Sequence, residues 1–401
     1  MSELETSLRE LRDDLRSSIS RPGLGRVADR ARQRAVRRRM QVGAITAVVL
    51  ASVAVPVLRS LPPAERPVAD PPASMSYQVD FADAQHGYAL GSDCDEPDGS
   101  CTFALLATAD RGRSWRPREL PAGDGLYENG ILLVLGRNRL TFNRIPLGTD
   151  KSVELFSSED GGHTWRNHGS ALSTPSPILV GARLERICDS GDANGSCVTG
   201  VGAVTGDGRL SPAPAQPPGE IQVVGEVATA DGRFWVASQD PATKAWSISL
   251  SSDAGVTWVT TPVDMPGEPW PAGAPWSVVE GGGVLYATAF GHIGTGPYGL
   301  LTVYRSTDGG TSWTQTWRAT PTDLLTAVAG SPVATSTGRL VLYSTTEGTV
   351  ESEDGTRFAP AARRLLGPVT WTRAGYLAEG EHNEYELSSD GLGWQAFTIR
   401  R

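Results

Sequence analysis

The sequence predicts an all-β fold, a β-propeller of about seven four-stranded blades, preceded by an N-terminal cytoplasmic helix and one transmembrane helix. Three observations lead to this prediction. Gly and Pro are abundant, with 46 and 28 copies among 401 residues, a composition that favours many turns. A turn-like motif recurs along the chain after residue 100. One long uncharged segment follows a cluster of arginines near the N-terminus.

The recurring motif is an octapeptide of the pattern Ser/Thr-x-Asp-x-Gly-x-Ser/Thr-Trp. Its near-complete copies are 108–115, 158–165, 251–258 and 306–313, two shortened relatives are 352–358 and 388–394, and a weak relative is Thr205-Gly206-Asp207-Gly208. The aspartates recur at a mean spacing of about 47 residues, the length of one four-stranded propeller blade. The weak copy is counted because without it the gap from Asp160 to Asp253 would be about twice that mean.

These octapeptides resemble the Asp-box, or BNR, repeats of sialidases, sortilin-type receptors and photosystem-assembly propellers, here in a membrane-anchored bacterial form. The resemblance covers about residues 75–401. Within it, the run Phe81–Gly91 looks like the strand pair that precedes a box in the photosystem-assembly type. The resemblance implies a sialidase-like propeller over this part of the chain.

The residue types of the motif suit a tight turn between two strands. An Asp side chain accepts hydrogen bonds from turn N–H groups, Gly supplies the positive φ of a hairpin, and Trp begins the next strand and packs between blades. Because each aspartate belongs to a different blade, the set cannot act together in acid–base catalysis. We therefore predict no catalytic role for the structural Asp-box residues, which are Asp110, Trp115, Asp160, Trp165, Asp253, Trp258, Asp308, Trp313, Asp354, Asp390 and Trp394.

Positive charge is concentrated at the N-terminus. Residues 1–40 hold 11 Arg and 6 acidic residues, whereas residues 60–401 hold 24 basic and 39 acidic residues. That excess of 15 negative charges repels nucleic-acid phosphates. We therefore expect the large domain to bind no DNA or RNA.

The uncharged run 41–58, QVGAITAVVLASVAVPVL, predicts a transmembrane helix over residues 41–59. Eighteen helical residues span about 27 Å, close to the thickness of the hydrocarbon core. Arginines crowd the N-terminal side and only Arg59 follows closely, so the positive-inside rule places residues 1–40 in the cytoplasm and residues 75–401 outside the cell membrane. A cleaved signal peptide is the alternative, but its charged region would be about 40 residues long.

Two segments flank this helix. In the cytoplasmic tail, apolar residues spaced by 3 and 4 predict a helix that begins with a Ser2 and Glu5 capping box and ends before Pro22. Its apolar stripe fits either a short amphipathic helix that dimerises or lies on the membrane, or a docking helix for a cytoplasmic partner. On the other side, the five prolines of residues 60–74 predict an extended, semi-rigid linker.

The four cysteines form two local pairs, and each pair brackets a short acidic loop. In an oxidising compartment, the disulfides Cys94–Cys101 and Cys188–Cys197 are the simplest of three pairings. Zinc is the alternative, but CxxC spacings are absent and the five His are scattered. The loop carboxylates could hold calcium, yet neither loop has EF-hand spacing, and solvated loop charge is the simpler interpretation. We predict no metal and no cofactor.

Two classes of function remain for the propeller, and a third involves the tail. The first is a non-catalytic module that binds an envelope protein or a glycan. The second is an exo-glycosidase of the sialidase type, because sialidases carry an Arg-Ile-Pro motif and Arg144-Ile145-Pro146 occurs here. In sialidases, however, that motif precedes the first box, and here it follows one and no nucleophile pair can be assigned. We interpret the match as coincidental. The third is a transmembrane sensor that signals through the N-terminal tail.

Overall fold

The computed structural model describes residues 75–94, 101–121, 127–146, 154–169, 173–179, 182–191, 197–205, 209–225, 228–229, 231–265, 268–269, 276–320 and 325–399. The predicted tail (1–40), transmembrane helix (41–59) and linker (60–74) lie outside the described residues. Among the residues described, no helix is long and apolar enough to cross a membrane.

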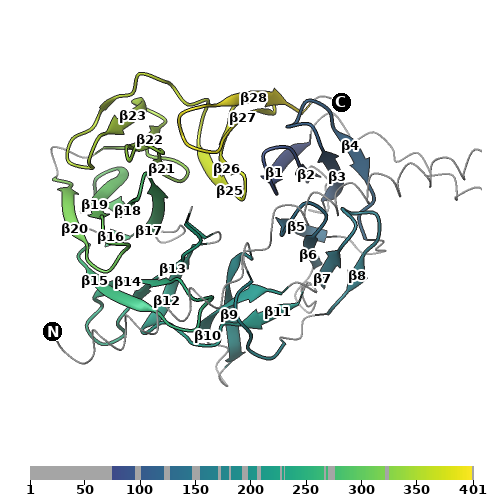
Figure 1. Ribbon diagram of the computed structural model, residues 1–401, viewed down its shortest axis with the longest axis horizontal. Coiled ribbons are helices and arrows are strands. Elements are labelled where there is room, and N and C mark those ends of the chain that lie inside the picture. The colour runs from purple at the N-terminus through teal and green to yellow at the C-terminus, as the bar shows by residue number, and fades with distance from the viewer. Residues whose placement is uncertain are drawn as a thin grey trace, which may run out of the picture. The chain divides into compact units, whose positions relative to one another are not determined.

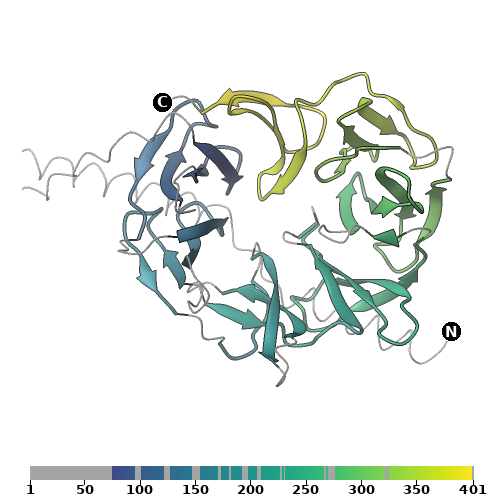
Figure 2. The same cartoon turned by 180° about the vertical axis from the view of Figure 1, so that it is seen from behind.

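Seven antiparallel sheets follow one another around a central axis (Figures 1 and 2). Each sheet is formed by one continuous stretch of chain, and we number the sheets as blades 1 to 7 in chain order. The predicted seven-bladed, all-β propeller is therefore confirmed. Blade 1 contains β1 (Ser76–Phe81), β2 (Gly87–Asp93), β3 (Thr102–Thr108) and β4 (Arg116–Arg118); blade 2 contains β5 (Tyr127–Val134), β6 (Leu140–Pro146), β7 (Glu154–Ser158) and β8 (Arg166–Asn167); blade 3 contains β9 (Leu184–Gly191), β10 (Cys197–Val204) and β11 (Leu210–Pro212).

The remaining four blades complete the ring. Blade 4 contains β12 (Glu220–Val224), β13 (Phe234–Gln239), β14 (Trp246–Ser251) and β15 (Val259–Val263); blade 5 contains β16 (Glu268–Pro269), β17 (Trp276–Gly281), β18 (Val284–His292), β19 (Tyr298–Ser306) and β20 (Thr314–Arg318). Blade 6 contains β21 (Val333–Ala334), β22 (Leu340–Ser344), β23 (Gly348–Ser352) and β24 (Ala359–Pro360), and blade 7 contains β25 (Val369–Thr372), β26 (Gly375–Glu379), β27 (Glu384–Ser388) and β28 (Gln395–Thr398).

Neighbouring strands of a blade are antiparallel, so successive turns lie alternately on the two faces of the ring. In the five four-stranded blades, and in blade 5 when β17 to β20 are counted as its four strands, the turns between first and second strands and those between third and fourth strands therefore lie on one face of the ring. We call it the octapeptide face, because the six octapeptides join third to fourth strands there. Loops between second and third strands lie on the opposite face.

The core consists of apolar clusters between adjacent blades. One cluster joins blades 4 and 5 through side chains such as Trp235 and Trp276, and another joins blades 5 and 6. The last blade meets the first through a cluster that includes Tyr77 and Phe81 of blade 1 and Tyr385 and Phe397 of blade 7. No strand of the described chain is shared between these two blades, so side chains close the ring, through this packing and through the hydrogen bond from the Tyr385 hydroxyl to the Tyr77 carbonyl (3.2 Å).

Blade 3 differs from the predicted four strands, because only three strands are described in it. The segment before β9 contains Pro175 and Pro177. Proline lacks the N–H that a central strand must donate. In the structure, residues 173–178 instead lie along the outer edge of β11, where the amides of Ser173 and Ser176 donate to the carbonyls of Leu210 (2.9 Å) and Pro212 (3.2 Å).

Candidate functional site

Each near-complete octapeptide forms the same hydrogen-bonded turn. In blade 5, Asp308 Oδ1 accepts hydrogen bonds from the Ser306 hydroxyl (2.8 Å) and the Ser312 amide (3.0 Å), and Oδ2 accepts one from the Ser312 hydroxyl (2.5 Å). The Gly310 amide donates to the Ser306 hydroxyl at 2.8 Å, and Gly310 has a φ of +85°. The same four bonds surround Asp110, Asp160 and Asp253.

The shortened copies keep part of this arrangement. Asp354 Oδ1 accepts from the amide and hydroxyl of Thr356, and Asp390 Oδ1 accepts from the amides of Leu392 and Gly393. The weak copy at residues 205–208 joins β10 to β11, but residues 206–208 lie outside those described.

These hydrogen bonds keep the octapeptide aspartates charged. The Ser312 hydroxyl and amide and the Ser306 hydroxyl lower the pKa of Asp308 to about 2, because they stabilise the carboxylate over the acid. A group that is ionised throughout the neutral range has no proton to give as a general acid. The geometry supports a structural role.

The octapeptide tryptophans pack against apolar clusters between blades. Trp313 packs against the cluster of blades 4 and 5, and Trp258 packs against the cluster that joins blades 3 and 4. The indole N–H of Trp165 donates to the carbonyl of Glu119 in blade 1 (2.8 Å), and that of Trp258 donates to the carbonyl of Ala215 in blade 3 (2.9 Å). Each of these two turns therefore connects its own blade to the preceding one.

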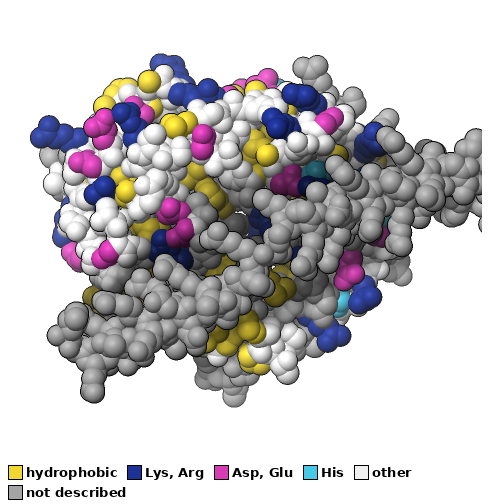
Figure 3. Space-filling model, in the orientation of Figure 1, with side chains coloured by type: hydrophobic (Ala, Val, Ile, Leu, Met, Phe, Trp, Pro, Cys, Tyr) yellow, Lys and Arg dark blue, Asp and Glu magenta, His cyan; other side chains and the backbone are white. Residues whose placement is uncertain are grey.

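The candidate binding site lies at the centre of the ring instead. A cavity of about 420 Å³ is lined by the inner strands β1, β12, β17 and β25, together with residues from neighbouring turns and second strands. Its polar lining includes Gln78, Asp80, Arg183 and Glu280. Its aromatic lining includes Trp276 and Trp371. Figure 3 shows one face of the ring, on which acidic and basic side chains lie next to one another.

A buried ion pair marks one side of this cavity. Arg183 and Asp80 are 7 % and 2 % exposed, and the guanidinium of Arg183 lies 3.0 Å from Asp80 Oδ2. Burial raises the pKa of Asp80, and the charge of Arg183 opposes that shift. Arg373 adds a second positive charge near Asp80, and its guanidinium also donates to the carbonyl of Leu135 in blade 2. Asp80 of blade 1 therefore contacts an arginine of blade 3, and the charge of Arg373 in blade 7 also lowers the Asp80 pKa.

Side chains of β1 also cover the neighbouring inner strand. The Gln78 amide group donates to the carbonyl of Leu132 and accepts from its N–H, both at 3.2 Å. Two residues further along β1, Asp80 Oδ2 accepts from the N–H of Val134 at 3.4 Å. Gln78 and Asp80 thus satisfy channel-facing backbone groups of β5, which would be costly to bury without partners.

Blades 4, 5 and 7 also line the cavity. Trp276 is 1 % exposed and packs beside Trp246, at 6.2 Å between ring centroids. Trp371 is half-buried and lies edge-on to Tyr376, at 4.4 Å between centroids. Burial raises the pKa of Glu280, and the nearby charge of Asp231 adds to the shift. Apolar rings and a few polar groups therefore face one cavity, as in many ligand sites.

The Arg-Ile-Pro motif lies away from this cavity. The guanidinium of Arg144 contacts Glu154 of the adjacent strand at 2.7 Å and lies 4.8 Å from the ring centre of Phe156. It also donates to the carbonyl of Pro121 at 3.2 Å. Arg144 is thus engaged within blade 2, and it is not among the residues that line the cavity.

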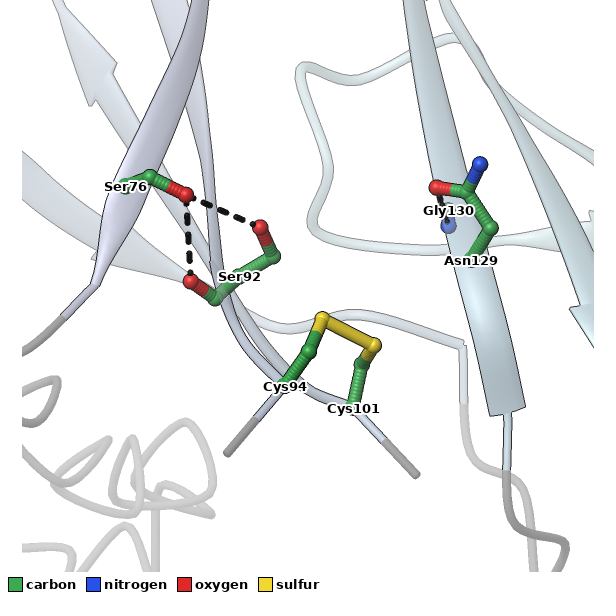
Figure 4. Close-up of a disulfide and its surroundings, with 6 residues drawn as sticks. All are labelled: Ser76, Ser92, Cys94, Cys101, Asn129 and Gly130. Carbon is green, nitrogen blue, oxygen red and sulfur yellow. Dashed lines mark hydrogen bonds between the residues drawn. A yellow bond between two sulfur atoms is a disulfide. The ribbon is translucent and has the colours of Figure 1, made fainter. Parts of the chain in front are cut away.

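One predicted disulfide is present. Cys94 and Cys101 are bonded across the loop that joins β2 to β3 (Figure 4). Cys188 and Cys197 occupy the matching strands β9 and β10 of blade 3, but their side chains lie outside those described. The acidic residues between Cys94 and Cys101 also lie outside the described part, and within that part no cluster of His, Cys, Asp or Glu could hold a metal ion.

Comparisons with known proteins find distant structures. No protein-family model matches the chain, and no curated protein matches it. A xyloglucanase of family GH74 from Xanthomonas campestris is 17 % identical over 80 % of this chain and 66 % of its own, with a TM-score of 0.34. The BP39L lectin from Burkholderia pseudomallei is 13 % identical over 81 % and 98 %, with a TM-score of 0.42, and a sialidase from Trypanosoma rangeli is 11 % identical over 80 % and 53 %, with a TM-score of 0.34.

The chain thus spans about two thirds of the xyloglucanase and about half of the sialidase. Likenesses at such identities and TM-scores carry no argument about activity. The seven-bladed architecture agrees with the resemblance to BNR-repeat propellers.

Proposed function

We propose that the chain is a membrane-anchored, extracytoplasmic binding module, and that its propeller holds part of an envelope protein or glycan at the central cavity without catalysing a reaction. The observation that carries the proposal is this cavity. Its volume of about 420 Å³ is typical of a ligand site, and aromatic rings such as Trp371 face it together with a few charged groups.

The polar side chains considered for catalysis already have partners within the protein, and this favours a binding role over hydrolysis. Asp80 is held in an ion pair with Arg183 and accepts from the Val134 amide. A sialidase-type site would need several free arginines around a substrate carboxylate, whereas Arg144 of the Arg-Ile-Pro motif is engaged within blade 2. The octapeptide aspartates serve as turn acceptors.

An extracytoplasmic location is supported by charge and by cysteine chemistry. The arginines that precede residue 41 favour a cytoplasmic N-terminus. The Cys94–Cys101 disulfide suits an oxidising compartment. A reporter that is active only outside the cytoplasm should therefore be active when fused after Arg401. An inactive C-terminal fusion together with an active N-terminal fusion would reverse the proposed orientation.

The binding role is tested with the full-length protein in lipid nanodiscs. Native envelope is separated into protein and glycan fractions, and each is measured for saturable binding and for turnover, with a fluorogenic sialoside as an additional substrate. We expect saturable binding of one fraction and no turnover. Sialoside hydrolysis would favour the exo-glycosidase alternative, and failure of both fractions to bind would contradict a binding module.

A further inference from the structure

One acidic side chain of the cavity is incompletely partnered by the protein. Glu280 lies next to the end of β17 and lines the cavity, and its Oε2 atom is buried without a hydrogen-bond donor among the described residues. Burial raises the Glu280 pKa, and the charge of Asp231 raises it further; the amides of Asp231 and Gly283 and the charge of Arg233 lower it by less. Because an incompletely paired carboxylate is costly to bury, a cation would be stabilised beside Glu280.

The arginine in the neighbouring turn of blade 4 already pairs with another acid. Arg233 contacts the carboxylate of Asp231 and donates a hydrogen bond to the carbonyl of Gly309 in blade 5. Asp231 also accepts from the hydroxyl of Thr229 at 2.6 Å, and Thr229 lines the same cavity as Glu280. No Lys, Arg or His occurs in the segments in and around blades 4 and 5 that the structure does not describe, which are 226–227, 230, 266–267, 270–275 and 321–324. These segments therefore supply no cation for Glu280.

The Trp371 ring lies at the same end of the cavity as Glu280. Gly281, the next residue of β17, is packed so closely on blade 6 that an added Cβ would collide with the Ala334 carbonyl. The Ala334 amide donates to the Tyr376 hydroxyl (2.9 Å), which donates back to the Ala334 carbonyl (2.8 Å). Tyr376 lies edge-on to Trp371 and pairs with it across β25 and β26. Ala334 thus connects the strand that carries Glu280 to the blade that carries Trp371.

The rest of the described lining is mainly apolar. Phe290 and Trp276 are 5 % and 1 % exposed, and valines of β12, β17 and β25 line the cavity with them. Of the other charged and amide side chains in this lining, Gln78 binds backbone groups of β5 and Asp80 contacts Arg183. A ligand group that is apolar along its length and carries one positive charge therefore matches the lining better than a group rich in hydroxyls.

We propose that the cavity receives a lysine side chain of an envelope protein, whose four-carbon stem packs among the aromatic rings and whose ammonium group pairs with the Glu280 carboxylate. This inference rests on the proposed function, binding at the channel, and names the group that is bound. Burial of Oε2 leaves at most one carboxylate oxygen for a ligand. Lysine suits this better than arginine, because an ammonium pairs with a single oxygen whereas a guanidinium binds two. The nearby Trp371 ring also favours a cation.

The test uses full-length protein in nanodiscs and a library of short peptides with a central lysine, acetylated at the N-terminus and amidated at the C-terminus. Enriched peptides are measured against wild type, Glu280→Gln and Glu381→Gln. Gln keeps the shape of Glu without its charge, and Glu381, whose side chain is 93 % exposed, controls for the change in net charge. We expect Glu280→Gln to weaken binding about 10- to 100-fold and Glu381→Gln to bind as wild type.

Changes in the peptide complete the cycle. Acetylation of the central lysine removes its charge, so it should weaken binding to wild type by a similar factor and change binding to Glu280→Gln little. Replacement of the lysine by arginine should also weaken binding to wild type. Thermal denaturation should show Glu280→Gln to be at least as stable as wild type, because the substitution removes an incompletely paired buried charge. Equal binding by wild type and Glu280→Gln, or a library without any binder, would overturn the proposal.

The envelope fractions separate this inference from the proposed function. Chemical acetylation of the lysines in the protein fraction should abolish its saturable binding to wild type. A protein fraction that binds equally well after acetylation, or a glycan fraction that binds while no lysine peptide is enriched, would overturn the lysine ligand and leave the proposed function standing. Failure of the peptides and of both envelope fractions would contradict both.

Discussion

At the seam between the last and first blades the described residues share no strand, so side-chain contacts close the ring, and Phe397 lies at the centre of these contacts. The Phe397 ring stacks on Tyr385 (5.4 Å between centroids) and lies edge-on to Phe81 (5.5 Å). It also lies 6.2 Å from the ring of Trp115, the tryptophan of the first octapeptide. The Phe397 side chain is only 8 % exposed. Phe397→Ala therefore removes an aromatic ring that is almost fully buried.

The expected cost of Phe397→Ala follows from this burial. Truncating a buried Phe to Ala lowers the free energy of unfolding by about 3–5 kcal/mol. For a domain that spans residues 75–399, the entropy of unfolding is about 0.7 kcal/mol per kelvin, so the melting temperature should fall by roughly 4–7 °C. Differential scanning calorimetry of the full-length protein measures the shift directly.

A matched control separates the seam from general loss of core packing. Phe142 is 1 % exposed and packs between blades 1 and 2, which the chain itself connects. Phe142→Ala should lower the melting temperature by a similar amount. Only Phe397→Ala should also speed hydrogen exchange selectively in blades 1 and 7, because those blades can separate locally. An unchanged melting temperature for Phe397→Ala, or the same exchange pattern in both variants, would refute packing as the closure of the ring.

Three further predictions concern the turns and the thiols. Trp313→Ala should lower the melting temperature by more than Asp308→Ala, because the indole packs between blades 4 and 5 whereas the carboxylate lies in an exposed turn; the reverse order in thermal denaturation would contradict the structural role of the octapeptide. The pKa of Asp308 is about 2 in the folded protein, below its value of about 3.9 in the unfolded chain. The stability that the Asp308 carboxylate contributes is therefore complete above about pH 4 and is lost as the pH falls through 2. The urea midpoint of wild type should drop over this pH window, and that of Asp308→Asn should drop less. Peptide mapping of the unreduced protein should link Cys94 to Cys101 and Cys188 to Cys197, and titratable thiols after denaturation would argue against the pairing in the second loop.

Repetition made the blades predictable from the sequence. The octapeptide is a local structure in which Asp308 bonds residues only two and four positions away, so its residues remain close together in the sequence and their spacing reports the blade length. Cys94 and Cys101 were predictable for the same reason, since seven positions separate them.

The cavity was not predictable, because ring closure assembles it. Asp80 and Arg183 are 103 positions apart, and neither belongs to a motif. Arg373 approaches Asp80 only because blade 7 packs against blade 1. Blade 3 has only three strands among the described residues, and Pro175 and Pro177 in the segment before β9 are a signal in the sequence for this difference.

Two tryptophans of blade 7 allow the central claim, ligand binding at the channel, to be tested most directly. Trp371 lines the cavity, whereas Trp394 belongs to an octapeptide turn, where its indole N–H donates to the carbonyl of Gly391 at 3.1 Å. Equilibrium binding of the envelope fraction to full-length protein should weaken roughly 30-fold in Trp371→Ala, the factor that corresponds to 2 kcal/mol. Trp394→Ala should lower the melting temperature but bind as wild type at temperatures where it is folded. Equal binding by wild type, Trp371→Ala and Trp394→Ala would contradict binding at the channel. Loss of binding in Trp394→Ala alone would contradict it as well.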